Sequence, residues 1–227
     1  MGRLFRWFGA LLFVLSLLSF ALVYQVRLGV PAADDGHALR DAAIDVALFT
    51  FFALHHSLMA RSGAKGWITR RLPPMMERSV YVWIASVLFL AVCWLWRPVP
   101  GIIWQLHGPG LALYVAQIFG VILTIAAARI VGVWELAGVQ QPDLTKPIEF
   151  KAQGPFALVR HPIYLGWVLM VFATPLMTTS RLVFAIISTV YLIAAIPFEE
   201  RSLLESFPEK YGAYQKQMRW KLIPLIW

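Results

Sequence analysis

Arg160 and His161 are the residues best placed to bind a charged ligand, because Pro162 follows them directly. Proline suits the first position of a helix, so a helix is predicted to begin at Pro162. The N-terminus of a helix offers free N–H groups and a positive dipole end, which favour a carboxylate or a phosphate. Arg160 adds a planar set of hydrogen-bond donors at the same place. The segment therefore predicts a binding site for an anionic group.

Two adjacent carboxylates, Glu199 and Glu200, are expected to meet this basic pair. Between them lie two apolar stretches, 162–177 and 182–198, which predict a helical hairpin that runs out and back. Because a hairpin returns to the face where it began, the two carboxylates, the imidazole and the guanidinium are predicted to converge. Adjacent residues point about 100° apart on a helix, so one glutamate can face a ligand while the other pairs with a basic group.

The elements that position these residues are predicted to be transmembrane helices. The chain is 59% hydrophobic and only 14% charged, whereas a soluble domain carries roughly 25% charged residues. A membrane-spanning helix needs about 20 mostly apolar residues, and six stretches approach this length: 7–26, 42–60, 80–96, 111–128, 162–177 and 182–198. The last two are short and contain Pro175 and Pro197. The sequence therefore predicts an all-α, polytopic transmembrane bundle of about six helices, five or six in all.

The basic residues indicate how such a bundle is oriented. If the N-terminus is inside and six helices alternate, only Arg27, Arg40, Arg97 and Arg181 of the 20 lysine and arginine residues fall outside. Cytoplasmic loops of membrane proteins are enriched in these residues. We therefore expect an integral protein of the bacterial inner membrane with cytoplasmic N- and C-termini. The acidic head groups of the lipid bilayer then balance the net charge of +8, and no nucleic-acid partner is expected.

The C-terminal motifs resemble the signature of integral membrane methyltransferases, which include isoprenylcysteine carboxyl methyltransferases and phospholipid N-methyltransferases. The resemblance rests on Gly154-Pro155, Arg160-His161-Pro162-x-Tyr164-x-Gly166, Glu199-Glu200 and Phe207 with Tyr211 and Tyr214. It implies that S-adenosyl-L-methionine (SAM) binds in this region. The residues expected to bind the cofactor are Gly154, Pro155, Val159, Arg160, His161, Tyr164, Leu165, Gly166, Glu199, Glu200 and Tyr211.

The chemistry of SAM agrees with these residue types. A glutamate can accept hydrogen bonds from its ammonium or ribose, and Arg160 or the amides near His161 can hold its carboxylate. Tyr164 can face the sulfonium by cation–π attraction. The chain is expected to divide into a four-helix transmembrane part on the substrate side, 1–132, and a helical hairpin with a tail, 133–227, that forms the SAM site.

The N-terminal half resembles the bacterial branch that contains methanethiol S-methyltransferases. The resemblance rests on His55-His56-Ser57-x-Met59-Ala60-Arg61, Trp67 and Pro73-Pro74-x-x-Glu77-Arg78-Ser79-x-Tyr81-Val82. It points to His55, His56, Glu77 and Arg78 as substrate-side residues. Structural roles remain open for all four, since the histidines can serve as hydrogen-bonding groups and the other two can cap the third helix. Cys93 is the single cysteine, and adjacent histidines cannot share a helix face, so no metal site is expected.

The resemblance implies methyl transfer from SAM to a small or lipophilic thiol such as methanethiol, with His161, Arg160 and Glu200 as catalytic residues. The thiolate is the nucleophile, and His161, His55 or His56 is its candidate proton acceptor. The acceptor is thus a small or lipid-like molecule that can arrive through the bilayer. The alternatives are methylation of an isoprenylcysteine carboxylate or a phospholipid amine, or a non-catalytic membrane accessory protein of the same fold. The oligomeric state is left open.

Overall fold

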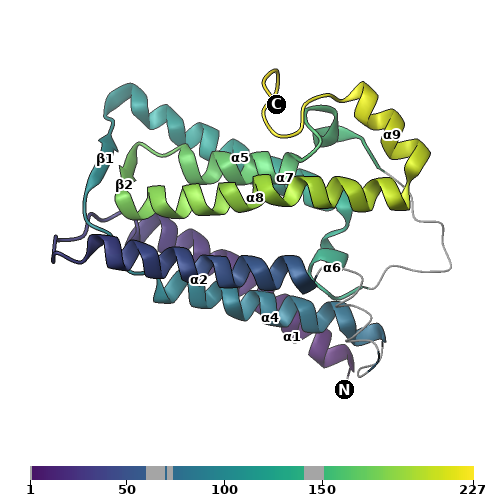
Figure 1. Ribbon diagram of the computed structural model, residues 1–227, viewed down its shortest axis with the longest axis horizontal. Helices are drawn as coiled ribbons and strands as arrows, with labels where there is room; N and C mark the ends of the chain where they lie inside the picture. The colour runs from purple at the N-terminus through teal and green to yellow at the C-terminus, as the bar shows by residue number, and fades with distance from the viewer. Residues whose placement is uncertain (1, 60–69, 71–73, 141–150) are drawn as a thin grey trace. The chain divides into compact units, whose positions relative to one another are not determined.

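The computed structural model describes residues 2–59, 70, 74–140 and 151–227, and it is predominantly helical (Figure 1). The helices are α1 (Gly2–Leu22), α2 (Ala38–Met59), α4 (Pro74–Leu95), α5 (Leu113–Val131), α6 (Val133–Leu136), α7 (Pro162–Phe172), α8 (Thr179–Ser206) and α9 (Pro208–Gln217). A π-helical turn, Val23–Arg27, continues α1, and 3₁₀ turns cover Gly108–Ala112 and Gly154–Ala157. The strands β1 (Ile102–Gln105) and β2 (Leu176–Thr178) pair into a small sheet that was not predicted.

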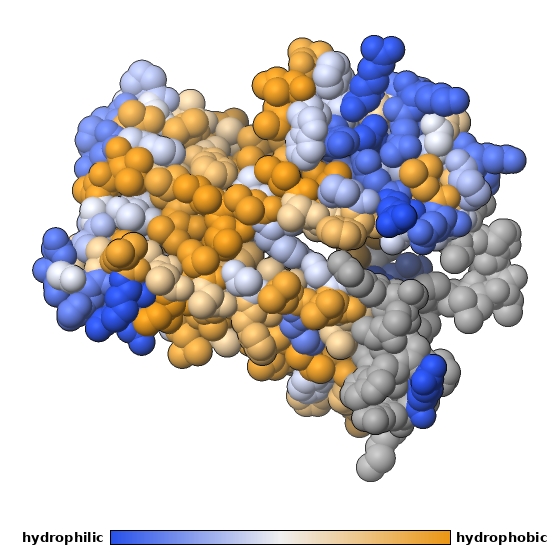
Figure 2. Space-filling view, in the orientation of Figure 1, coloured by the Kyte–Doolittle hydropathy of each residue, from blue (hydrophilic) through white to orange (hydrophobic). Residues whose placement is uncertain are grey.

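The membrane-spanning character predicted from the sequence is confirmed. Within the described residues, five helices are long and apolar enough to cross a bilayer, and α7 is a shorter apolar helix. Only between 17% and 33% of the apolar window of each long helix is buried in the protein. Hydrophobic side chains cover much of the visible face (Figure 2). Since such a surface is stable only against lipid, the fold is that of an integral membrane protein.

The last two helices differ in length from the prediction. Helix α7 ends at Phe172 because Pro175 has no N–H and disfavours a helical conformation at Thr174. Helix α8 is longer than expected, since it continues through Pro197 to Ser206. Glu199 and Glu200 therefore lie inside a helix, about two turns before its end, and not at its end as predicted.

The structure divides into two compact units, and each is built around its own core. The first comprises the described parts of 1–104, 134–142 and 176–187. In it, α4 packs against both α1 and α2 (Figure 1). Aromatic rings fill its interior, with Phe184 stacked on Phe20 at 5.4 Å between ring centroids and against Trp96 at 5.1 Å.

The four arginines predicted to lie on the outer side of the membrane all belong to this first unit. Each of them is paired with a group of the same unit. Arg97 and Arg40 both pair with Asp41 at 3.1 Å. Arg27 donates to the carbonyl of Trp94, and the buried Arg181 donates to the carbonyls of Tyr24 and Gln25. Their charge serves the packing of this unit, so they do not argue against the predicted orientation.

The second unit comprises the described parts of 105–133, 143–175 and 188–227. Helices α5 and α7 lie side by side in it (Figure 1). Its buried core contains Leu123 from α5, Leu165 from α7, Ile196 from α8, together with Val159 and Leu222. This core fixes the start of α7 and the later part of α8, which carry the predicted functional residues.

Candidate active site

The structure brings the basic pair and the two glutamates together in the second unit. Arg160 Nε donates to Glu200 Oε1 at 2.7 Å, and His161 Nε2 lies 3.3 Å from the same oxygen. His161 Nδ1 lies 3.5 Å from Glu199 Oε2, which also accepts a hydrogen bond from the Tyr164 hydroxyl at 2.7 Å. We call these five residues the charged cluster. The convergence predicted from the hairpin is therefore present.

His161 lies between two carboxylates and is best described as an imidazolium. A neutral imidazole carries one N–H, whereas both ring nitrogens of His161 face a carboxylate oxygen, an arrangement that both N–H groups of the charged form satisfy. Burial lowers the pKa of His161, but the hydrogen bonds and charges of Glu199 and Glu200 outweigh burial and raise it above its usual value. The Tyr164 ring stacks on the imidazole at 5.3 Å.

The carboxylates differ in exposure, and this separates their possible roles. The side chain of Glu199 is 46% exposed, whereas those of Arg160, His161 and Glu200 are 8%, 3% and 11% exposed. Glu200 is thus enclosed by its partners, while Glu199 has room for a further donor. A ligand that carries an ammonium or hydroxyl groups would meet Glu199 first.

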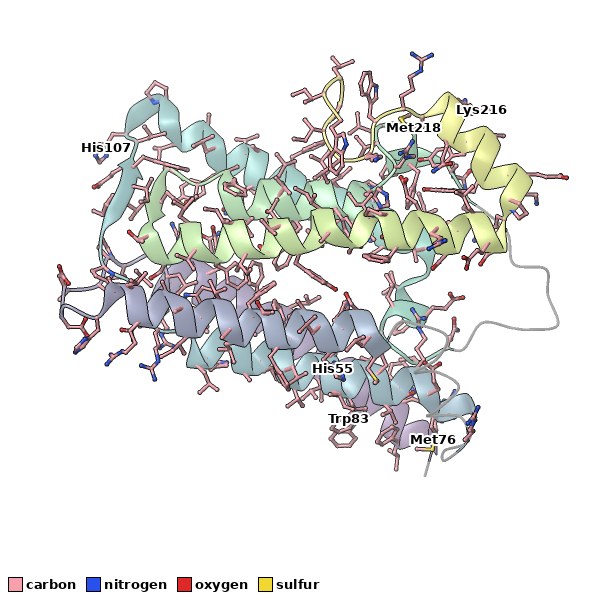
Figure 3. All side chains as sticks on the ribbon, in the orientation of Figure 1. His55, Met76, Trp83, His107, Lys216 and Met218 are labelled. Atoms are coloured by element: carbon pink, nitrogen blue, oxygen red, sulfur yellow. The ribbon has the colours of Figure 1, made fainter. Side chains whose placement is uncertain are left out.

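Helix α9 and the chain after it complete the cluster from a direction that the sequence did not indicate. Gln215 Nε2 donates to Glu200 Oε2 at 3.3 Å, and Arg160 Nη1 donates to the carbonyl of Met218 at 3.2 Å. Figure 3 shows Met218 just beyond the end of α9. Tyr214 donates to the carbonyl of Phe156 at 2.7 Å. The spacing of Gln215 from Tyr211, four residues along one helix face, could have revealed Gln215.

The chain at 220–221 binds the backbone just before α7. The amides of Arg160 and His161 donate to the carbonyls of Trp220 and Lys221 at 2.8 and 2.9 Å. The amides near His161 were predicted to be available for an anionic group, and in the structure the amides of Arg160 and His161 are already paired. An anion at this helix start would therefore meet the guanidinium of Arg160 before these amides. Main-chain contacts of this kind leave no mark in side-chain patterns.

The remaining residues predicted to bind the cofactor surround the cluster or support it. Tyr211 is buried, and burial, followed by the negative charge of Glu200, raises the pKa of its hydroxyl. Gly154 has a left-handed φ of +60° and opens the 3₁₀ turn with Pro155.

Three further residues predicted to bind the cofactor lie in the packed core or at a contact between helices. Val159 and Leu165 lie in the core. Gly166 faces α5, where an added Cβ would lie 2.6 Å from the Gly120 carbonyl oxygen. Their predicted contact with a cofactor stays a prediction.

The predicted substrate-side residues belong to the first unit. The ring of His56 lies 2.8 Å from the Tyr81 hydroxyl, and His55, labelled in Figure 3, has a buried Nδ1 without a partner among the described residues. Arg78 donates to the carbonyl of Glu135, and Glu77 lies in the first turn of α4. Their role toward a substrate stays a prediction.

Comparison with known proteins places this chain in a class. A profile described as phospholipid methyltransferase matches residues 107–210, a stretch that contains all five residues of the charged cluster. The helical membrane fold and this match define an integral membrane methyltransferase. No solved structure matches the chain.

Curated relatives narrow the class. The chain is 36% identical to the methanethiol S-methyltransferase of Mycobacterium tuberculosis over 93% of this chain and 92% of the relative. It is 37% identical to the methanethiol S-methyltransferase of Crocosphaera subtropica over 81% of this chain and 74% of the relative. It is 34% identical to methanethiol S-methyltransferase 1 of Bradyrhizobium diazoefficiens over 93% of this chain and 76% of the relative. The chain belongs to the methanethiol S-methyltransferase family, and the resemblance read from its motifs is confirmed.

Proposed function

We propose that this chain transfers a methyl group from SAM to a small or lipophilic thiol, with methanethiol as the first candidate. The observation that carries the proposal is the charged cluster, which lies within the stretch matched by a methyltransferase family. Support for the acceptor comes from the relatives, which are named for methanethiol and are similar over most of the chain.

The residues of the cluster fit the polar groups of SAM. When bound, SAM supplies a methyl group made electrophilic by its sulfonium. The half-exposed Glu199 carboxylate can accept from the ammonium or the ribose hydroxyls. Arg160 uses Nε and Nη1 for Glu200 and Met218, which leaves Nη2 to donate to the carboxylate. The Tyr164 ring, held by Glu199 and His161, is an aromatic surface that can attract a cation.

His161 is proposed to hold the two carboxylates and not to accept the thiol proton. A protonated imidazole has no lone pair to take a proton. The thiol must still lose its proton, because the thiolate is the nucleophile, and the remaining candidate acceptors are water, His55 and His56. His55, His56, Glu77 and Arg78 remain the proposed substrate-side residues. Alignment of the two reactants can supply roughly 7–11 kcal/mol of the barrier reduction.

The bilayer is proposed to deliver the acceptor. Small thiols and longer alkanethiols partition into hydrocarbon, whereas SAM reaches the protein from water. The proposed location is the bacterial inner membrane with both termini in the cytoplasm, which places the charged cluster on the side where SAM is made. This arrangement accounts for a methyltransferase whose helices expose so much apolar surface.

The activity can be tested with purified protein, radiolabelled SAM and a panel of acceptors. Methanethiol should give labelled dimethyl sulfide in the headspace, detected by gas chromatography. Arg160→Gln should lower turnover at least about tenfold, since a buried charge pair is broken. Arg201→Gln is the matched control, because Arg201 directly follows Glu200 on α8 and its side chain is 79% exposed. If no thiol in the panel gives a labelled product, the proposal is rejected.

The same panel decides the second candidate, methylation of a phospholipid amine. The profile match to phospholipid methyltransferases over residues 107–210 favours including it. Phosphatidylethanolamine and a prenylated cysteine are therefore added as acceptors, with lipid extraction and thin-layer separation as the measurement. Label that appears in the lipid fraction and not in the headspace would replace the thiol with that acceptor.

A further inference from the structure

The segment 222–227 forms a closed turn in which Leu222 is buried while the apolar side chains that follow it are exposed. The amides of Leu222 and Ile223 both donate to the carbonyl of Trp227, at 2.8 and 3.0 Å. Ile223, Leu225 and Ile226 are 38%, 80% and 74% exposed. Figure 2 shows hydrophobic side chains gathered at this turn beside the hydrophilic surface over α9. We call this segment the 222–227 turn.

The backbone of the turn is strained in order to display this surface. Leu225 has a φ of 66° and is the single non-glycine residue with a positive φ in the described part of the chain. A left-handed conformation is unfavourable for a residue that carries a Cβ. Within the protein, an 80% exposed leucine gains little packing in return. The exposed apolar side chains of the turn are therefore available to a partner outside the chain.

The position of the turn identifies that outside partner as lipid. Leu222 is fully enclosed in a core formed with Leu123 of α5 and Leu165 of α7. Leu123 lies within the membrane-spanning stretch Gly108–Val131, about two turns from its end. A turn anchored there by its first residue lies at the level of the bilayer and not in bulk water. Figure 1 shows the C-terminal end of the chain beside α5 and α7.

Basic residues lie just before the turn and match an anionic lipid surface. Lys216 and Arg219 are exposed, and Lys221 holds its ammonium 5.0 Å from the centre of the Trp227 ring. Tryptophan and lysine are typical of the boundary between head groups and acyl chains. Apolar side chains flanked by such cations are the pattern of a segment that lies in the membrane interface.

We propose that the 222–227 turn inserts into the bilayer leaflet on the α9 side and is held there by anionic head groups. The insertion has a consequence for the charged cluster. Trp220 and Lys221, which lead directly into the turn, hold the amides of Arg160 and His161, and Met218 accepts from the Arg160 guanidinium. Lipid contact at the turn therefore keeps the cluster assembled.

The insertion is tested by the depth of a spin label in nanodiscs. A nitroxide is attached to Leu225→Cys and, as the matched water-facing position, to Ala213→Cys on the exposed face of α9, both with Cys93→Ala. The label at 225 should be more accessible to oxygen, which dissolves in lipid, than to a water-soluble nickel chelate, and the label at 213 should show the reverse. A label at 225 that is as accessible to the chelate as the label at 213 would overturn the proposal.

The lipid preference is read from the same labels. Replacing part of the phosphatidylcholine with phosphatidylglycerol should move the label at 225 deeper and leave the label at 213 unchanged. With Lys216→Gln and Arg219→Gln together, this difference should vanish. A depth at 225 that does not depend on the anionic lipid would overturn the role given to head groups.

The link to the cluster is tested with S-adenosylhomocysteine, and this arm rests on the proposed function. Leu225→Asp with Ile226→Asp should weaken its binding in nanodiscs at least about fivefold, whereas Ala213→Asp should leave binding unchanged. Unchanged binding in the double variant would refute the link. If the wild-type protein binds no S-adenosylhomocysteine, the proposed function fails, and the label depths still decide whether the turn inserts.

Discussion

Glu200 accepts hydrogen bonds from three side chains, those of Arg160, His161 and Gln215. A carboxylate that is 11% exposed is costly to bury, and paired donors offset this cost. The second carboxylate, Glu199, keeps one side open. At the scale of residues, the cluster therefore consists of a closed ion pair that fixes the geometry and an open carboxylate that can receive a ligand.

The protonation of His161 gives the cluster a defined dependence on pH. Because its pKa is raised in the folded state, the imidazolium stabilises the fold fully below its ordinary pKa of about 6.5. This stabilisation is lost as the pH rises through the folded-state pKa. The wild type should therefore have a higher melting temperature than His161→Gln, and this difference should be larger at about pH 6 than at about pH 9.

The exposed His107 supplies the control for this measurement. His107→Gln should have the same melting temperature as the wild type at both pH values. A His161→Gln deficit that grows with rising pH would mean that His161 is neutral in the fold, and the imidazolium description would be wrong.

Sequence patterns predicted the side chains of the cluster and missed those that hold it in place. Arg160, His161 and the two glutamates were found because a hairpin must return to its starting face. Gln215 and the carbonyls of Met218, Trp220 and Lys221 were missed, since main-chain acceptors are available at any residue type. For the same reason the amides near His161 were expected to be available, although those of Arg160 and His161 are paired.

At the scale of elements, the crossing of α5 and α7 sets the position of the cluster. Gly166 on α7 lies against Gly120 and Thr124 on α5, and an added Cβ would lie 2.2 Å from the Thr124 hydroxyl oxygen. The helices can approach this closely only because residues 120 and 166 are both glycine. The crossing thus fixes the first turn of α7, which follows directly after Arg160 and His161.

Gly166→Ala should therefore force the two helices apart. We expect a loss of about 1–3 kcal/mol in stability, seen as a lower melting temperature in detergent and weaker binding of S-adenosylhomocysteine. Gly212→Ala is the matched control, because nothing lies within 4 Å of a Cβ added there. That change should be neutral or slightly stabilising. Equal melting temperatures for the two variants would show that the close crossing is not required.

The element boundaries show where local signals suffice. Pro162 predicted the start of α7, and Pro175 accounts for its early end. Pro197 did not end α8, which continues to Ser206. Interior prolines are tolerated in membrane helices when neighbouring groups satisfy the freed backbone carbonyl. The pairing of β1 with β2 joins segments far apart in the chain, and their short apolar runs gave no signal of it.

For the molecule as a whole, the amino-acid composition was enough to predict the fold class. Low charge and long apolar stretches predicted a membrane bundle, and the exposed apolar faces of the helices bear this out. The orientation is a further prediction. Fusion of green fluorescent protein after Trp227 should fluoresce, while alkaline phosphatase inserted before His107 should be active outside the cytoplasm. An active phosphatase after Trp227 would reverse the proposed topology.

If the charged cluster binds SAM as proposed, calorimetry with S-adenosylhomocysteine should detect the loss of one of its carboxylates. Glu199→Gln removes the charge of the open carboxylate, and Glu205→Gln is the matched change on the same helix, where the side chain is 72% exposed. The wild type and Glu205→Gln should bind alike, and Glu199→Gln should bind at least about tenfold more weakly. Equal affinity for all three proteins would show that the Glu199 carboxylate does not bind the ligand.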